Sequence, residues 1–208
     1  DGTKMFLTGT ESRAVSEYHL TTAFDVSTAS FDSSFSVSSE ETAPMSVKFN
    51  NDGTKMFVTG VSSDKVHEYT LSTAFDVSTA SLEDSLSVSG QDNNPFGLDF
   101  NNDGTKMYLT GDQNDKIYEY NLSTGFDLST ASFNQELYLG SQDIEPFGIE
   151  FSPDGTRMFI VGTRDNGIDE YVLSTGFDIS TATHVCFLST RYHDDSGNPS
   201  GIAFSEDG

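Results

Sequence analysis

The chain repeats a similar stretch of sequence, and one position of the repeat carries a different charge in each copy. Lys48, Asp99 and Glu150 occupy this position in successive copies, and Ala203 occupies it in the next. A repeat scaffold builds an asymmetric site only where its copies differ. An ammonium group and two carboxylates can bind a small polar ligand or a cation, and they can equally be a set in which Lys48 neutralises its neighbours. Lys48, Asp99 and Glu150 are therefore our first candidate ligand-binding set.

A second candidate lies where the fourth copy is two residues longer than the others. Arg191, Tyr192, His193 and Asp194 belong to this segment, which has no counterpart in the other copies. Loops carry binding residues more often than the elements they connect, so the segment is a plausible place for a ligand contact. Simple drift of a surface loop is the alternative.

Charged residues also recur without variation. A glutamate stands at the same place in every copy, and a basic residue stands on the neighbouring predicted strand. The glutamates are Glu17, Glu68, Glu119 and Glu170, and the basic residues are Lys4, Lys55, Lys106 and Arg157. We predict a cross-strand ion pair in each copy, worth under ~1 kcal/mol if it is exposed. Four identical carboxylates around a pore are the alternative.

No residues are assigned to catalysis, and no metal site is predicted. The four histidines, His19, His67, His184 and His193, do not recur at one position, and no pair has the spacing of metal ligands. Residues 112–116 and 93–94 resemble fragments of calcium-binding loops, but they lack the alternating ligands and the closing glutamate of such a loop. We therefore expect no cofactor, with a divalent cation such as calcium as the open alternative.

The sequence predicts the strands that position these residues most clearly at residues 95–111. Apolar residues alternate with other residues on both sides of Asp103-Gly104, as in two half-buried strands. Gly104 can adopt the positive φ that closes a tight turn. A β-hairpin is therefore predicted here and in each other copy.

The repeat begins with Asp-Gly-Thr-Lys/Arg-Met at Asp1, Asp52, Asp103 and Asp154, in three steps of 51 residues. Each copy contains four predicted strands, and the third is polar enough to be a solvated outer edge. Between the second and third strands an aspartate precedes Ser by two positions, which predicts an Asx-turn; these residues are Asp25, Asp76, Asp127 and Asp178. β-rich repeats of this length are typical of propeller blades.

We therefore predict an all-β fold, a β-propeller of four four-stranded antiparallel blades in a single domain over residues 1–208. The chain starts with the second strand of a blade, and residues 200–205 have the sequence of a first strand. Pairing of this C-terminal strand with the N-terminal blade would close the propeller and remove an edge. The closed form is then a monomer or, if two chains pair, a dimer with twice as many blades.

The charge of the chain limits its partners. It carries 33 acidic and 10 basic residues, a formal net charge of −23. Nucleic acid and anionic membrane surfaces require clustered Lys and Arg, which the sequence lacks, and no apolar run is long enough for membrane insertion. Strong acidity keeps a protein soluble in saline surroundings, which favours a marine setting.

The sequence also resembles a known class. Phe151-Ser-Pro-Asp-Gly-Thr-Arg-Met-Phe-Ile-Val161 is similar to the strand–turn–strand signature of YVTN-type and lactonase-like β-propellers. The longer unit Glu-Tyr-x-Leu-Ser/Thr-Thr-Ala/Gly-Phe-Asp-x-Ser-Thr-Ala resembles tandem propeller repeats of large surface and phage-associated proteins of marine microbes. The resemblance covers the whole chain and implies the propeller fold, together with an extracellular or cell- or virion-surface location.

Two functions remain open. The first is a non-catalytic propeller that acts as a binding or structural module, recognising glycans or a partner protein, because nearly identical blades suit multivalent weak binding. The alternative is a lactonase-like hydrolase with a metal-assisted site near the central channel. An enzyme needs different chemical groups that converge on one point, whereas the copies of this repeat are nearly identical in sequence. The sequence therefore favours the binding module over an enzyme.

Overall fold

The computed structural model describes residues 1–140, 145–163, 166–190 and 200–204. Its regular elements are strands, apart from one short 3-10 turn in each repeat, and no helix of the described residues is long and apolar enough to cross a membrane. The chain divides into two compact units, Asp1–Ser87 and Val88–Gly208. The segment with Arg191, Tyr192, His193 and Asp194 lies outside the described residues.

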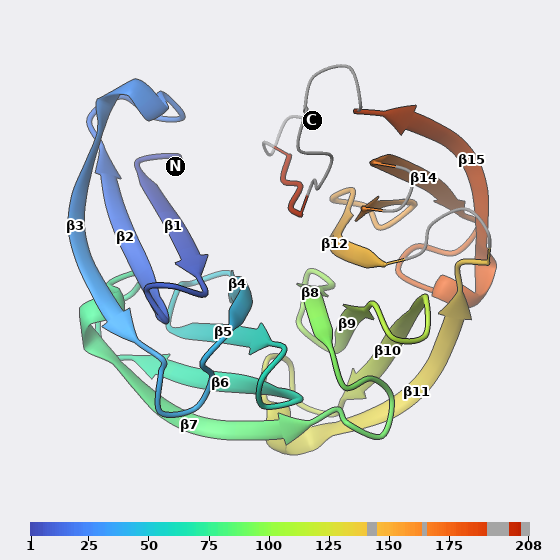
Figure 1. The fold of residues 1–208 in the computed structure, drawn as a ribbon, viewed down its shortest axis with the longest axis horizontal. Coiled ribbons are helices and arrows are strands. Elements are labelled where there is room, and N and C mark those ends of the chain that lie inside the picture. Colours follow the sequence, from blue (N-terminus) through green and yellow to red (C-terminus); the bar gives the residue numbers. More distant parts are fainter. Residues whose placement is uncertain (141–144, 164–165, 191–199, 205–208) are drawn as a thin grey trace. The chain divides into compact units, whose positions relative to one another are not determined.

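The first unit contains two antiparallel sheets, which we call blade one and blade two (Figure 1). Blade one has the strands β1 (Lys4–Gly9), β2 (Ala14–Leu20) and β3 (Ala29–Ser36). Blade two has the strands β4 (Pro44–Phe49), β5 (Lys55–Gly60), β6 (Lys65–Leu71) and β7 (Ala80–Ser87). In both sheets, strands that are consecutive in sequence pair with each other.

The second unit contains blade three and blade four, each with four antiparallel strands. Blade three has β8 (Pro95–Phe100), β9 (Lys106–Gly111), β10 (Lys116–Leu122) and β11 (Ala131–Tyr138). Blade four has β12 (Pro146–Phe151), β13 (Arg157–Gly162), β14 (Gly167–Leu173) and β15 (Ala182–Ser189). The 3-10 turns are Val26–Thr28, Val77–Thr79, Leu128–Thr130 and Ile179–Thr181. The predicted all-β fold of β-propeller blades is confirmed.

Local sequence explains these strands. β8 and β9 form the predicted hairpin, in which Gly104 adopts φ 70° and its N–H donates to the carbonyl of Asn101. The third strand of each blade has no buried residue, as its polarity predicts. A β-bulge falls between the Glu and the Tyr of every Glu-Tyr pair, which breaks the alternation of side chains at the same place in each blade.

Each unit has its own core between its two blades. In the first unit the core is made of Val15, Val37, Met56, Val58, Tyr69, Leu71 and Val77. In the second unit it is made of Tyr108, Ile117, Leu139, Ile149, Phe151, Met158, Ile160, Tyr171, Leu173 and Ile179. Both sets combine side chains of one blade with side chains of the next, including one from its 3-10 turn. Burial of this turn is therefore a recurring part of the packing.

The closing strand predicted over residues 200–205 lies partly outside the described residues, and its pairing with blade one stays a prediction. Residues 200–204 are described without strand structure, and blade one has three strands rather than four. A strand is stabilised by its ladder of backbone hydrogen bonds, and the described residues give this segment no ladder. It instead lies against blade four, where the ring of Phe204 is 4.6 Å from that of Phe159.

Candidate functional site

The invariant Lys and Glu residues form the predicted ion pair in every blade. The pairs are Lys4 with Glu17, Lys55 with Glu68, Lys106 with Glu119 and Arg157 with Glu170. The two partners are diagonal neighbours on adjacent strands, because Glu17 lies opposite Phe6 and Lys4 lies opposite His19. The prediction of a cross-strand pair is confirmed.

The burial of these pairs differs from that of a surface ion pair. The side chains of Glu17, Glu68 and Glu119 are at most 2 % exposed, whereas their Lys partners are 26–35 % exposed. A buried carboxylate needs several donors to replace its water. In blade three these donors are Lys106, at 3.0 Å, and the side-chain amides of Asn134 and Gln135.

The pair also binds the next blade of its unit. In the first unit, Lys4 Nζ donates to the carbonyl of Phe75 at 2.7 Å, and Glu17 Oε2 accepts from the N–H of Val77 at 3.0 Å. Each contact is to the start of the 3-10 turn of blade two. We call this arrangement the clamp: the basic residue, the glutamate and the turn of the following blade.

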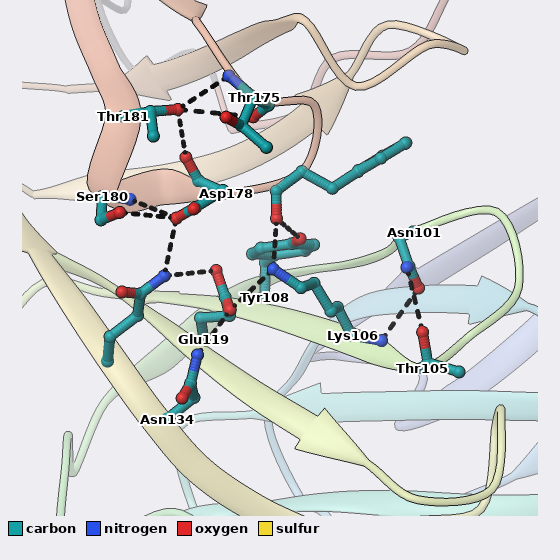
Figure 2. Close-up of polar contacts among 12 residues, drawn as sticks. Asn101, Thr105, Lys106, Tyr108, Glu119, Asn134, Thr175, Asp178, Ser180 and Thr181 are labelled. Carbon is teal, nitrogen blue, oxygen red and sulfur yellow. Dashed lines mark hydrogen bonds and ion pairs between the residues drawn. The ribbon is translucent and has the colours of Figure 1, made fainter.

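The clamp of blade three is drawn in Figure 2, where Lys106, Tyr108 and Glu119 point toward the turn that carries Asp178. Lys106 Nζ and the Tyr108 hydroxyl both donate to the carbonyl of Phe177, at 2.8 and 2.6 Å. Burial, with Glu119 nearby, raises the pKa of Tyr108 and keeps its hydroxyl protonated as a donor. Glu17 and Glu119 therefore belong to contacts that hold two blades together rather than to a ring around a pore.

The turn that enters the clamp has the predicted Asx geometry. Asp25, Asp76, Asp127 and Asp178 each accept the backbone N–H of the Ser two residues ahead, at 3.0–3.1 Å. Hydrogen bonds from Ser180 and Gln135 hold the pKa of Asp178 below its ordinary value. Since Gln135 belongs to β11, this bond is a further contact between blades three and four.

The varying residues on the first strands are divided between the two units. Asp99 on β8 and Glu150 on β12 lie on neighbouring strands of the second unit, and Lys48 lies on β4 of the first unit. Asp99 is 8 % exposed, and its Oδ2 accepts from the N–H of Phe151 at 3.2 Å. Asp99 thus satisfies an N–H on the strand that begins the next blade, which is a structural role that sequence reasoning did not predict.

A buried carboxylate of the first unit, Glu41, accepts several hydrogen bonds and was also not predicted. Glu41 is fully buried and accepts from Ala43, Ser62 and Ser63. The Ser63 hydroxyl lies 2.7 Å from Glu41 Oε2 and 3.0 Å from His67 Nε2. Burial raises the pKa of Glu41, but these hydrogen bonds outweigh it and leave the pKa below its ordinary value.

His67 continues this network to the outer strand. Its Nδ1 is 2.8 Å from the Ser85 hydroxyl, and burial lowers its pKa, so the ring is neutral and one nitrogen accepts. Ser63 and His67 are the groups of a serine nucleophile and its base. In blade three, however, Asp92 occupies the place of Glu41, and like Glu41 it accepts a backbone N–H of its own loop, from Asn94. The role that Glu41 and Asp92 share is to hold the loop before the first strand of their blade. In the sequence, this role is indicated by a carboxylate three residues before the Pro that begins that strand.

Apolar residues recur in an exposed position on the third strand. Phe31, Leu82 and Phe133 are 61 %, 46 % and 44 % exposed, and each lies opposite a Tyr of the second strand. Phe31 and Phe133 contact Tyr18 and Tyr120 edge-on, with ring centroids 5.8 Å apart in both blades. His184 takes this position in blade four, where it also contacts Asp169 at 2.6 Å.

Comparison with known proteins shows the fold of these blades. No protein-family model matches the sequence, and no curated protein matches it. Among solved structures, a candidate 6-phosphogluconolactonase of Bacteroides fragilis superimposes with a TM-score of 0.63 at 13 % identity, over 91 % of this chain and 52 % of that one. The fold is that of a β-propeller.

Two further structures agree. The periplasmic gluconolactonase of Pseudomonas aeruginosa has a TM-score of 0.54 at 16 % identity, over 91 % of this chain and 51 % of that one. A β-propeller domain from Myceliophteria thermophila has a TM-score of 0.55 at 14 % identity, over 83 % and 51 %. The chain therefore spans about half the length of the structures that it matches.

Proposed function

We propose that this chain is a non-catalytic, repeat-built β-propeller module that recognises a glycan or a protein surface. The observation that carries the proposal is the exposed apolar position on the third strand, which recurs as Phe31, Leu82 and Phe133. An aromatic ring that is exposed beside polar neighbours offers a flat apolar face for a sugar ring or an apolar side chain. Repetition of such a face adds avidity without adding a new kind of contact.

The use of the invariant polar groups supports a module without catalysis. Glu119 is bound by Lys106, Asn134 and Gln135, and Lys106 also binds the next blade. Groups that the repeat keeps constant are thus engaged in holding blades together. The exposed positions of the third strand are then left to bind a ligand.

We also propose that the module works outside the cell, as part of a larger cell- or virion-surface protein. A net charge of −23 favours solubility where salt screens the repulsion between carboxylates, and it disfavours nucleic acid as a partner. The same charge repels anionic membrane surfaces.

A glycan array probed with the labelled 208-residue chain tests the proposal. The chain should bind a set of glycans, and the double variant Phe31→Ser/Phe133→Ser should lose roughly tenfold or more of the signal because two of the repeated faces are gone. Tyr138→Ser is the matched control, since Tyr138 is 63 % exposed but lies at the other end of β11. Equal loss in both variants would contradict the proposal. Binding to a protein library instead of glycans, with the same sensitivity to the double variant, would identify a protein ligand.

A lactonase-like hydrolase is the second candidate, and it rests on one observation. Asp99 and Glu150 place two carboxylates on neighbouring first strands, where a divalent cation such as calcium could assist hydrolysis. This function requires metal-dependent hydrolysis of simple lactones that is lost in Asp99→Asn and Glu150→Gln. We expect no such hydrolysis, and its detection would replace the binding module with the enzyme.

A further inference from the structure

Two loops of blade three lie at the same end of the sheet and contact each other. Residues 88–94 precede β8, and residues 112–115 join β9 to β10. The N–H of Asn93 donates to Oε1 of Gln113 at 3.4 Å, which is a long hydrogen bond. The two stretches that resemble fragments of calcium-binding loops belong to these loops. The fold therefore brings together two fragments that are separate in the sequence.

Asp92 is a buried carboxylate of the first of these loops. Its side chain belongs to a residue that is 1 % exposed, and its Oδ1 accepts the N–H of Asn94 at 2.9 Å. Its Oδ2 has two longer contacts, both at 3.5 Å, from Asn114 Nδ2 and from the Tyr118 hydroxyl. Hydrogen bonds to an ionised carboxylate are normally about 2.7–2.9 Å long. The Oδ2 atom of Asp92 is therefore only weakly satisfied by these two donors.

A second carboxylate, Asp112, lies beside the first. It follows Gly111, and a Cβ on Gly111 would be 2.4 Å from Cγ of Asp92. The Oδ1 atom of Asp112 is buried and has no hydrogen-bond partner among the described residues. Burial, together with the negative charge of Asp112, raises the pKa of Asp92. Because a buried carboxylate oxygen is costly unless something positive or a donor meets it, this unpaired oxygen indicates a bound cation.

The same place in blade two is filled by protein donors. Glu41 stands where blade three has Asp92, and it is longer by one methylene. Its Oε2 accepts from the N–H of Ser63 at 3.2 Å and from the Ser63 hydroxyl at 2.7 Å. Val61 stands where blade three has Asp112, so the second charge is absent from blade two. The difference between the two copies is thus a shorter carboxylate and an added one, which together leave oxygens for a ligand that blade two does not need.

We propose that these two loops of blade three bind a calcium ion between Asp92 and Asp112. The two carboxylates are its charged ligands, and carbonyl oxygens of the same loops, with water, complete its coordination. Ca²⁺ accepts oxygen ligands in irregular geometry, whereas Mg²⁺ needs a nearly ideal octahedron. The loops contain no His or Cys, the ligands that zinc prefers. With only two carboxylates, the affinity should be that of a weak site, with a Kd of about 10⁻⁴–10⁻³ M.

Titration of the 208-residue chain with calcium chloride, followed by amide NMR at physiological salt, tests this proposal. The salt screens diffuse attraction of cations to the acidic surface. The amides of residues 91–94 and 112–115 should shift together and saturate. Asp112→Asn should weaken this binding roughly tenfold or more, because it removes one of two charged ligands. Asp64→Asn removes an acid from the equivalent loop of blade two and should leave it unchanged. Shifts that do not saturate, or equal effects of both variants, would overturn the proposal.

A stability measurement separates a bound cation from a damaged loop. In calcium-free buffer, Asp112→Asn should be at least as stable as the unaltered chain, because it removes the repulsion between two carboxylates. Saturating calcium should then raise the thermal midpoint of the unaltered chain and of Asp64→Asn, since a ligand that binds the folded state stabilises it. The midpoint of Asp112→Asn should not rise. A midpoint that calcium leaves unchanged in the unaltered chain, or raises equally in all three proteins, would overturn the site.

Discussion

Blade three and blade four carry the same clamp sequence in different surroundings. In blade three, Glu119 is fully buried, and Lys106 and Tyr108 hold the carbonyl of Phe177. In blade four, Glu170 and Arg157 pair with each other but are 22 % and 54 % exposed. The repeat therefore encodes a contact with a neighbouring blade, and the stability that this contact provides depends on whether such a blade covers it.

The largest expected difference is in the cost of removing the glutamate. Glu119→Ala leaves Lys106 without its buried partner and should lower the free energy of unfolding by about 3 kcal/mol. Glu170→Ala removes a solvated pair and should cost under about 1 kcal/mol. Urea unfolding of both variants measures the difference. Equal costs would mean that the two clamps do not differ in burial as described.

A glycine comparison should give a smaller difference. A Cβ at Gly97 would lie 2.6 Å from Thr110 Oγ1 and 2.8 Å from the Phe147 carbonyl, whereas at Gly148 the nearest atom would be 3.3 Å away. Gly97→Ala should therefore destabilise by about 1–3 kcal/mol through overpacking. Gly148→Ala should change stability by less than about 1 kcal/mol. Thermal unfolding of both variants measures the two losses of stability. A larger loss in Gly148→Ala than in Gly97→Ala would refute the closer approach of backbones at Gly97.

The smallest effect concerns the hairpin turn of blade four. The N–H of Thr156 and the hydroxyls of Ser152 and Thr156 lower the pKa of Asp154 to about 2. Because the folded pKa is depressed, its contribution to stability is present above the unfolded value of about 3.9 and is lost as the pH falls toward 2. NMR titration should show that Ser152→Ala raises this pKa. An unchanged pKa would exclude Ser152 as a donor.

Local patterns were sufficient to predict much of this fold. The strands, the Asp103-Gly104 turn, the Asx turns and the Lys–Glu pairs depend on residues close in sequence or on adjacent strands. The burial of Glu17 could not be predicted in this way, because it depends on Val77 in the next blade, 60 residues away. The role of Asp99 was missed for the same reason, since its partner is a backbone N–H of β12.

The candidate site was less predictable than the fold. A varying position suggested Lys48, Asp99 and Glu150 as one set, but variation alone does not say which strands are neighbours; within the second unit, Asp99 and Glu150 lie on neighbouring strands. The Glu41–Ser63–His67 network was missed because His67 has no repeat partner, although Glu41 and Asp92 share a position before a Pro. The closing strand at residues 200–204 was predicted from its sequence alone. Such a segment becomes a strand only when an edge is there to pair with it.

Hydrogen exchange at the turn amides tests the central claim most directly, which is that the two blades of a unit are joined by a recurring contact between a Lys–Glu pair and the 3-10 turn of the following blade. The N–H of Val77 is bound by Glu17 and should exchange slowly. In Glu17→Ala the same N–H loses its acceptor and should exchange much faster. Rapid exchange of Val77 in the unaltered chain, or exchange that Glu17→Ala leaves unchanged, would contradict the account.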